Sequence, residues 1–80
     1  MKVLKFYAPT CMPCKMVGKM LDEFKDLEVI PIDATEDLSK VDEYEVCNTP
    51  TLIFLDESNN EVGRLTGMTT SKKIQEMLNK

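Results

Sequence analysis

Two cysteines three positions apart, Cys11 and Cys14, stand where a short apolar segment ends and a helix-like pattern begins. Residues 2–7 read as a β-strand, and in residues 12–25 the apolar side chains recur at helical spacing. At such a strand-to-helix junction the first helical N–H groups have no partner inside the helix, and the peptide dipoles carry partial positive charge. Both effects stabilise a thiolate, so Cys11 is predicted to act as the nucleophile in disulfide exchange.

The second cysteine is predicted to be the resolving thiol. Cys14 shares a face of the predicted helix with Cys11, so the two sulfurs can meet without unfolding the turn. Pro13 suits the first helical turn, where its missing N–H leaves nothing unpaired. The alternative, a pair of buried and inert thiols, is disfavoured because a C-x-x-C spacing in a strand–helix setting is typical of a redox motif.

Length and charge limit the domain organisation and the partners. The chain has 80 residues, with 42% hydrophobic and 30% charged residues and a net charge of −4. Residues 1–80 therefore make a single domain with the composition of an ordinary soluble protein. The negative charge argues against binding of nucleic acid or of an anionic membrane. No apolar segment is long enough for a signal peptide or a membrane span, and we expect a cytoplasmic monomer.

The cysteine count also bears on chemistry. Three cysteines form an odd set, whereas a disulfide scaffold in a small secreted domain normally has an even one. A bridge between Cys11 and Cys14 closes a very short loop and restricts the unfolded chain little, so it is expected to serve chemistry. The chain has no histidine, and a structural zinc site needs four ligands. No metal site is expected.

Strand and helix patterns continue along the first half of the chain. Leu27 to Asp33 reads as a second strand, and a strand, a helix and a strand in succession imply a parallel pair with a right-handed crossover. Thr35 is the expected N-cap of a short second helix. The inner face of the first helix is predicted to hold Met16, Val17, Met20, Leu21 and Phe24, and that of the second Leu38, Val41 and Tyr44.

The second half of the chain reads as a hairpin and a closing helix. The continuous apolar run Thr51 to Leu55 indicates a buried strand, and Glu61 to Thr66 indicates a fourth strand paired with it. Gly63 is the expected place of a β-bulge. A last helix is predicted from Ser71 to Asn79.

This order of elements, with C-x-x-C after the first strand and Thr49-Pro50 before the third, resembles the thioredoxin-like superfamily over nearly the whole chain. The resemblance implies an α/β, minimal thioredoxin-like fold, a four-stranded mixed sheet flanked by three helices. It further implies that Cys11 attacks and Cys14 resolves, that the peptide bond before Pro50 is cis, and that no cofactor is bound besides the redox-active Cys11–Cys14 disulfide.

A substrate site is implied around the two motifs, formed by Met12 and Pro13 together with Thr49 and Pro50. If the third strand pairs antiparallel with the first, Pro50 begins beside the cysteines. The Thr49 backbone can then pair with an extended substrate segment in the manner of an added strand. The alternative is a proline that only starts a strand.

Two further residues have open roles. Six residues before the first cysteine thioredoxins keep a buried acid that helps to deprotonate the resolving thiol, and this chain has Lys5 there. Either the Lys5 charge lowers a cysteine pKa, or its stem lies along the sheet with the ammonium reaching solvent. Cys47 is expected to pack as a small apolar residue. Its alternative role is a mixed disulfide with glutathione or a partner.

Three functions follow as hypotheses. The favoured one is a protein disulfide reductase, whose partners are protein disulfides and a thioredoxin reductase. The second is a glutaredoxin-like reductase recycled by glutathione, for which residues 67–70 only loosely match the glycine-rich turn of that family. The third is a non-catalytic redox sensor, in which the disulfide changes the binding of a partner.

Overall fold

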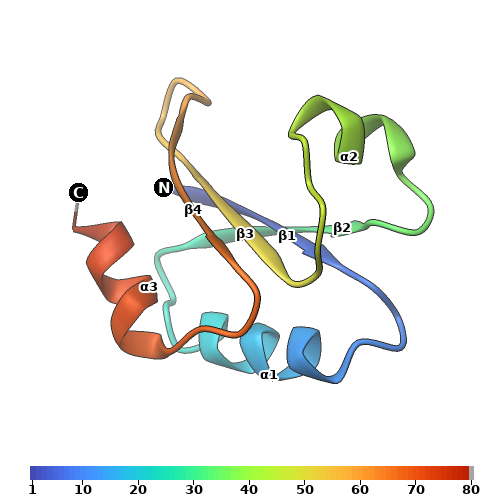
Figure 1. Cartoon of the computed structure of the whole chain (residues 1–80). Coiled ribbons are helices and arrows are strands. Elements are labelled where there is room, and N and C mark those ends of the chain that lie inside the picture. The colour runs from blue at the N-terminus through green and yellow to red at the C-terminus, as the bar shows by residue number, and fades with distance from the viewer. Residues whose placement is uncertain (80) are drawn as a thin grey trace.

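A computed structural model describes residues 1–79 as a four-stranded sheet with the strand order β2-β1-β3-β4 and helices on both of its faces (Figure 1). The strand β1 runs parallel to β2 and antiparallel to β3, which is antiparallel to β4. The predicted mixed sheet with three helices is therefore confirmed. The elements are β1 (Lys2–Tyr7), α1 (Met12–Leu21), β2 (Glu28–Asp33), α2 (Leu38–Glu43), β3 (Thr51–Leu55), β4 (Glu61–Thr66) and α3 (Ser71–Leu78).

The core consists of two apolar layers, one on each face of the sheet. The helices α1 and α3 lie together on one face and α2 lies on the other (Figure 1). All five residues of β3 are buried, because helices cover this central strand from both sides. The α1–α3 layer contains Val3, Val17, Leu21, Leu52, Phe54, Ile74 and Met77, and the α2 layer contains Leu4, Phe6, Ile32, Ile53 and Leu55.

The first helix is shorter than the predicted range of residues 12–25. It ends at Leu21, and the chain continues through tight turns in which Phe24 N–H donates to the Leu21 carbonyl at 3.0 Å and Leu27 N–H to the Phe24 carbonyl at 3.2 Å. These turns reverse the chain so that β2 can start at Glu28 beside β1. Phe24 and Leu27 still pack against the α1–α3 layer.

Two apolar residues predicted to face inward are exposed instead. Met16 is 53% exposed and Leu38 is 63% exposed. In α1 the buried line is Cys14, Val17 and Leu21. At 3.6 residues per turn Met16 lies about 100° around the helix from Val17, which turns it out of the core. Leu38 is the first residue of the short α2, none of whose residues is fully buried.

The start of α2 also differs from the prediction. The N-cap is Asp37, whose carboxylate accepts the N–H of Lys40 at 3.1 Å. Thr35 takes part in another turn, because its hydroxyl and its N–H both donate to Asp33 Oδ1, at 2.6 and 2.9 Å. The carboxylate of Asp33 thus holds the loop in a turn of its own, and the helix begins later.

The hairpin and the last helix follow the prediction closely. Between β3 and β4, Phe54 pairs with Gly63 and Leu55 with Glu61, so a bulge lies next to Gly63 as expected. The helix α3 ends one residue before Asn79, which is its C-cap. Within residues 1–79, none of the helices has the length and apolar character needed to cross a bilayer.

One side chain of β4 connects the hairpin to the end of α2. Arg64 donates to both carboxylate oxygens of Glu61, at 2.7 and 2.8 Å, and to the Tyr44 carbonyl at 2.9 Å. The paired hydrogen bonds from Arg64 lower the pKa of Glu61, an effect that partial burial opposes. The same bonds raise the pKa of Arg64.

We expect Glu61→Gln to lower the free energy of unfolding by about 0.5 kcal/mol at neutral pH, the scale of a partly exposed ion pair. Because the pKa of Glu61 is depressed in the folded chain, this contribution is present above the unfolded pKa of about 4.3 and disappears as pH falls through the folded pKa. Urea unfolding at neutral pH and at about pH 3 measures it. Glu57→Gln, an exposed change in the same hairpin, is the control. A loss for Glu61→Gln of equal size at both pH values would contradict the assignment.

Candidate active site

The two cysteines form a disulfide at the N-terminal end of α1, with Cα atoms 5.3 Å apart. Cys11 is the N-cap of the helix and has an extended backbone. The Cys14 N–H donates to Cys11 Sγ at 3.2 Å, and the Cys11 N–H donates to the Ala8 carbonyl at 3.0 Å. The sulfur of Cys11 thus occupies the position of a capping oxygen, where free helical amides and the helix dipole favour negative charge.

The two sulfurs differ in their access to solvent. Cys11 is half-buried, whereas Cys14 is only 3% exposed and lies on the sheet side of α1. When the disulfide is reduced, the N–H that now reaches Cys11 Sγ can make a charge-assisted hydrogen bond to a thiolate. A bulky disulfide substrate can approach Cys11 and not Cys14.

The loop before β3 lies at the same end of the sheet as the cysteines. Phe6 pairs with Thr51, so Pro50 stands across from the end of β1 at Tyr7. Tyr7 and Cys14 line the same cavity, which has a volume of about 220 Å³. The Thr49–Pro50 peptide bond is cis, as the resemblance implied.

The four residues predicted to contact a substrate differ in their exposure to solvent. Met12 is 65% exposed, Pro13 is exposed and Thr49 is half-buried. Pro50 as a whole is fully buried at the start of β3, so at this point a substrate can meet Thr49 but not Pro50. The Pro50 carbonyl accepts the Gly67 N–H at 2.8 Å, which brings the loop after β4 alongside.

Sequence reasoning missed two exposed apolar residues near this end of the molecule. Met16 lies one helical turn after Met12 on α1, and Met68, which is 49% exposed, follows Gly67 beside the Pro50 loop. We call Met12, Met16 and Met68 the exposed methionines. The spacing of four between Met12 and Met16 was a visible signal, but the location of Met68 beside the Pro50 loop involves the tertiary contact between Gly67 and Pro50. Methionine side chains adapt to varied partners.

The third cysteine does not pack in the core. Cys47 is exposed and free, which corrects the expectation of a small apolar core residue. Its neighbour Val46 takes the inward position instead, packing on the α2 layer while its N–H donates to the Val41 carbonyl at 3.0 Å. Because the side chain of Val46 points inward, that of its neighbour Cys47 points outward.

Lys5 is half-buried on the face of the sheet that α1 covers. Its Nζ lies 5.5 Å from the ring centroid of Tyr7 and 3.1 Å from the position that a Cβ on Gly18 would occupy. It also lines the cavity that contains Cys14. The ammonium therefore lies between β1 and α1 and is not fully in solvent.

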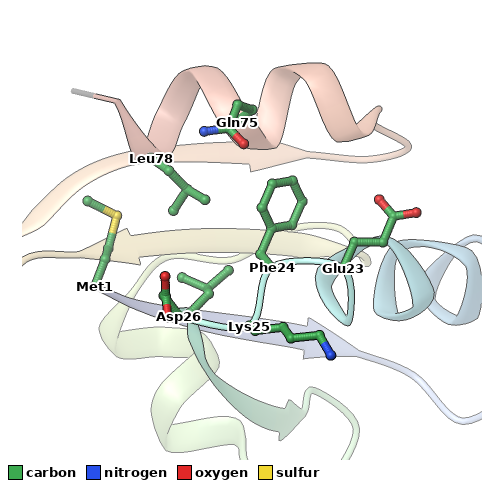
Figure 2. Close-up of a pocket in the computed structure, with 8 residues that line it drawn as sticks. Met1, Glu23, Phe24, Lys25, Asp26, Gln75 and Leu78 are labelled. Carbon is green, nitrogen blue, oxygen red and sulfur yellow. The ribbon is translucent and has the colours of Figure 1, made fainter.

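A larger pocket, of about 430 Å³, lies at the other end of the sheet. Figure 2 shows Met1, Phe24 and Leu78 pointing into it, with charged side chains at its rim. Met1 precedes β1, whereas the cysteines follow the far end of that strand. This pocket is consequently not part of the dithiol site.

Comparisons with known proteins identify the family of this chain. The family model described as Thioredoxin matches residues 1–80. The chain is 32% identical over 80 residues to a thioredoxin of Bacillus subtilis (strain 168), covering 94% of this chain and 76% of the relative. It is 30% identical over 84 residues to a thioredoxin of Staphylococcus epidermidis, covering 99% of this chain and 80% of the relative. The oxidized crystal structure of mitochondrial thioredoxin 3 from Saccharomyces cerevisiae shares the fold, with a TM-score of 0.83 at 24% identity over 99% of this chain and 77% of that one. The chain therefore belongs to the thioredoxin family and is a thiol–disulfide oxidoreductase whose redox-active group is the Cys11–Cys14 disulfide.

Proposed function

We propose that this protein reduces disulfide bonds in other proteins, with Cys11 as the attacking thiolate and Cys14 as the resolving thiol. The observation that carries the proposal is the unequal placement of the two sulfurs. Cys11 is accessible at the helix N-cap, where it accepts an N–H at 3.2 Å, and Cys14 is 3% exposed behind it. An attacking thiol needs access and a stabilised anion, whereas a resolving thiol needs only to reach its neighbour.

The reaction proceeds by two exchanges. The Cys11 thiolate attacks one sulfur of the substrate disulfide, so a mixed disulfide forms and the substrate bond breaks, and the departing thiolate takes up a proton. The Cys14 thiolate then attacks Cys11 Sγ, the Cys11–Cys14 bond forms and the second substrate thiolate leaves and is protonated. Two electrons and two protons pass from the dithiol to the substrate.

Protein substrates are proposed to dock across the cysteine end of the sheet. Within residues 1–79 the backbone N–H and C=O of Thr49 make no hydrogen bond, so they are available to an extended substrate segment. Met12 and Pro13 lie exposed between the cysteines, and the other two exposed methionines lie on α1 and in the loop after β4. Backbone pairing with adaptable apolar contacts suits substrates of varied sequence.

The oxidised protein needs an electron donor. We propose a flavin-dependent thioredoxin reductase using NADPH, since the curated relatives are thioredoxins. Glutathione is the competing donor. Insulin reduction is to be measured with each donor supplied separately, and sustained turnover with glutathione alone would favour the glutaredoxin-like alternative. Action as a cytoplasmic monomer remains our prediction from the sequence.

Cys14→Ser should trap a mixed disulfide with a protein substrate, because Cys11 can attack but nothing releases the product. The adduct is measured on non-reducing gels and should disappear with dithiothreitol. Cys11→Ser should trap none, and both changes are made in a Cys47→Ser background to remove the exposed third thiol. Trapping by Cys11→Ser alone would reverse the two roles. Absence of adducts and of insulin turnover, with a dithiol that still oxidises reversibly, would instead support the redox sensor.

A further inference from the structure

A lysine lies in the middle of the sheet, close to the resolving cysteine. Lys5 is on β1, a central strand, where it pairs with Leu52 of β3 and Pro31 of β2. By strand alternation it shares a face with Val3, which is buried beneath α1 and α3. Lys5 itself is half-buried, and restricted access to water makes a negatively charged partner favourable for its ammonium.

The ammonium of Lys5 lies against the turn of α1 that follows Cys14. Its Nζ is 3.1 Å from where a Cβ on Gly18 would be, so any side chain at that position would press on it. Gly18 is four residues after Cys14, on the same helix face, where Cβ positions are about 6 Å apart. The glycine thus leaves room for the ammonium one turn from the resolving sulfur, and Lys5 and Cys14 both line the cavity of about 220 Å³.

Among the described residues that line this cavity there is no carboxylate to neutralise the lysine. Its titratable and charged residues are Lys5 and Tyr7 from β1 and Cys14 and Lys15 from α1. The ion pairs found within residues 1–79 are Lys40–Glu43 and Glu61–Arg64, which do not involve Lys5. Reduction of the disulfide frees the thiol of Cys14, which can ionise and become the missing anion.

We infer that Lys5 is a positioning residue that stabilises the thiolate of Cys14 and so drives the resolving step without a carboxylate base. The inference rests on the proposed roles of Cys11 and Cys14. Lys5 takes no part in proton transfer, and Cys14 gives its proton to solvent. The Cys14 thiolate attacks Cys11 Sγ of the mixed disulfide, the Cys11–Cys14 bond forms, and the substrate thiolate leaves and is protonated by water.

The effect can be measured on the two steps separately. Reduced protein in a Cys47→Ser background is mixed with the aromatic disulfide DTNB, which releases one coloured thiolate when Cys11 attacks and a second when Cys14 resolves. A nearby opposite charge shifts a thiol pKa by about one unit or more. In Lys5→Met we therefore expect the pH midpoint of the second release to rise by about one unit, with a smaller change in the first release. At neutral pH the second release should slow about threefold, because the greater nucleophilicity of a more basic thiolate partly offsets the loss of ionised thiol.

Two variants control for charge and for packing. Lys5→Arg keeps the charge and should leave the pH midpoint of the second release nearly unchanged. Lys15→Met removes an exposed positive charge on the same cavity and should leave the second release nearly unchanged. Circular dichroism checks folding, and Lys5→Gln replaces Lys5→Met should the latter not fold.

An unchanged second release and pH midpoint in Lys5→Met would overturn the inference. If Lys15→Met slows the second release as much as Lys5→Met does, the inference is also overturned. The effect would then come from the total positive charge near the start of α1 and not from Lys5. The proposed function, in contrast, is tested by the number of thiolates released. If the parent gives no second release, or if Cys14→Ser still gives two, then the assigned roles of the cysteines fail whatever Lys5 does.

Discussion

Replacing Cys11 by serine should reduce insulin turnover to the rate of the reductant alone, a loss of more than about 1,000-fold. The hydroxyl of serine neither ionises at neutral pH nor forms a disulfide, so both the nucleophile and the intermediate disappear. The fold should persist, because serine is among the preferred N-cap residues and can accept the Cys14 N–H that now bonds to Cys11 Sγ. Turnover is measured with thioredoxin reductase and NADPH, and unfolding by urea.

The matched control for this change is Cys47→Ser. Cys47 is an exposed thiol in the same chain, with Sγ near the Glu45 carbonyl at 3.9 Å, and it has no part in the proposed exchange. It should retain the parent rate within about twofold, as a surface change away from the reacting groups. If Cys11→Ser keeps its turnover and Cys47→Ser loses it, then Cys47 is the catalytic thiol and the proposed mechanism is wrong.

Much of the fold was predictable because local patterns and tertiary structure agree. The run Thr51 to Leu55 is apolar throughout, and the central place of β3 buries all of it. The end of α1 was not predictable, since no glycine or proline stops the helix near Leu21 and the reversal is set by where β2 must begin. Thr35 and Asp37 are both good N-caps, and the choice between them depends on the carboxylate of Asp33.

The candidate site also has features that were predictable from the sequence and features that were not. The C-x-x-C spacing and its position after a strand located Cys11 and Cys14, because the helix N-terminus that affects them is a local feature. The sequence leaves two alternatives open for the Lys5 ammonium, because its position beside Gly18 is a contact between β1 and α1. The location of Met68 beside the Pro50 loop likewise involves a contact between two loops. Contacts between distant segments are not encoded in a short motif.

Phe54→Ala should lower the free energy of unfolding by about 3–5 kcal/mol, the cost of truncating a fully buried aromatic residue. Phe54 is 0% exposed in the α1–α3 layer. Gly63 stands across from it on β4 and has no side chain to fill the resulting cavity. A domain of this length has a total stability of about 4–12 kcal/mol, so the variant should be largely unfolded at the lower limit of that range. Urea unfolding followed by circular dichroism measures the loss.

The control is Phe24→Ala, which truncates a half-buried ring at the edge of the same layer and should cost less than half as much. Equal losses for the two variants would contradict the central role given to Phe54. The activity of Phe54→Ala should fall in parallel with its folded fraction, because the helix terminus that stabilises the Cys11 thiolate exists only in the folded chain. A variant that stays folded yet loses activity would mean that packing beneath α1, and not the helix terminus alone, sets the reactivity of the dithiol.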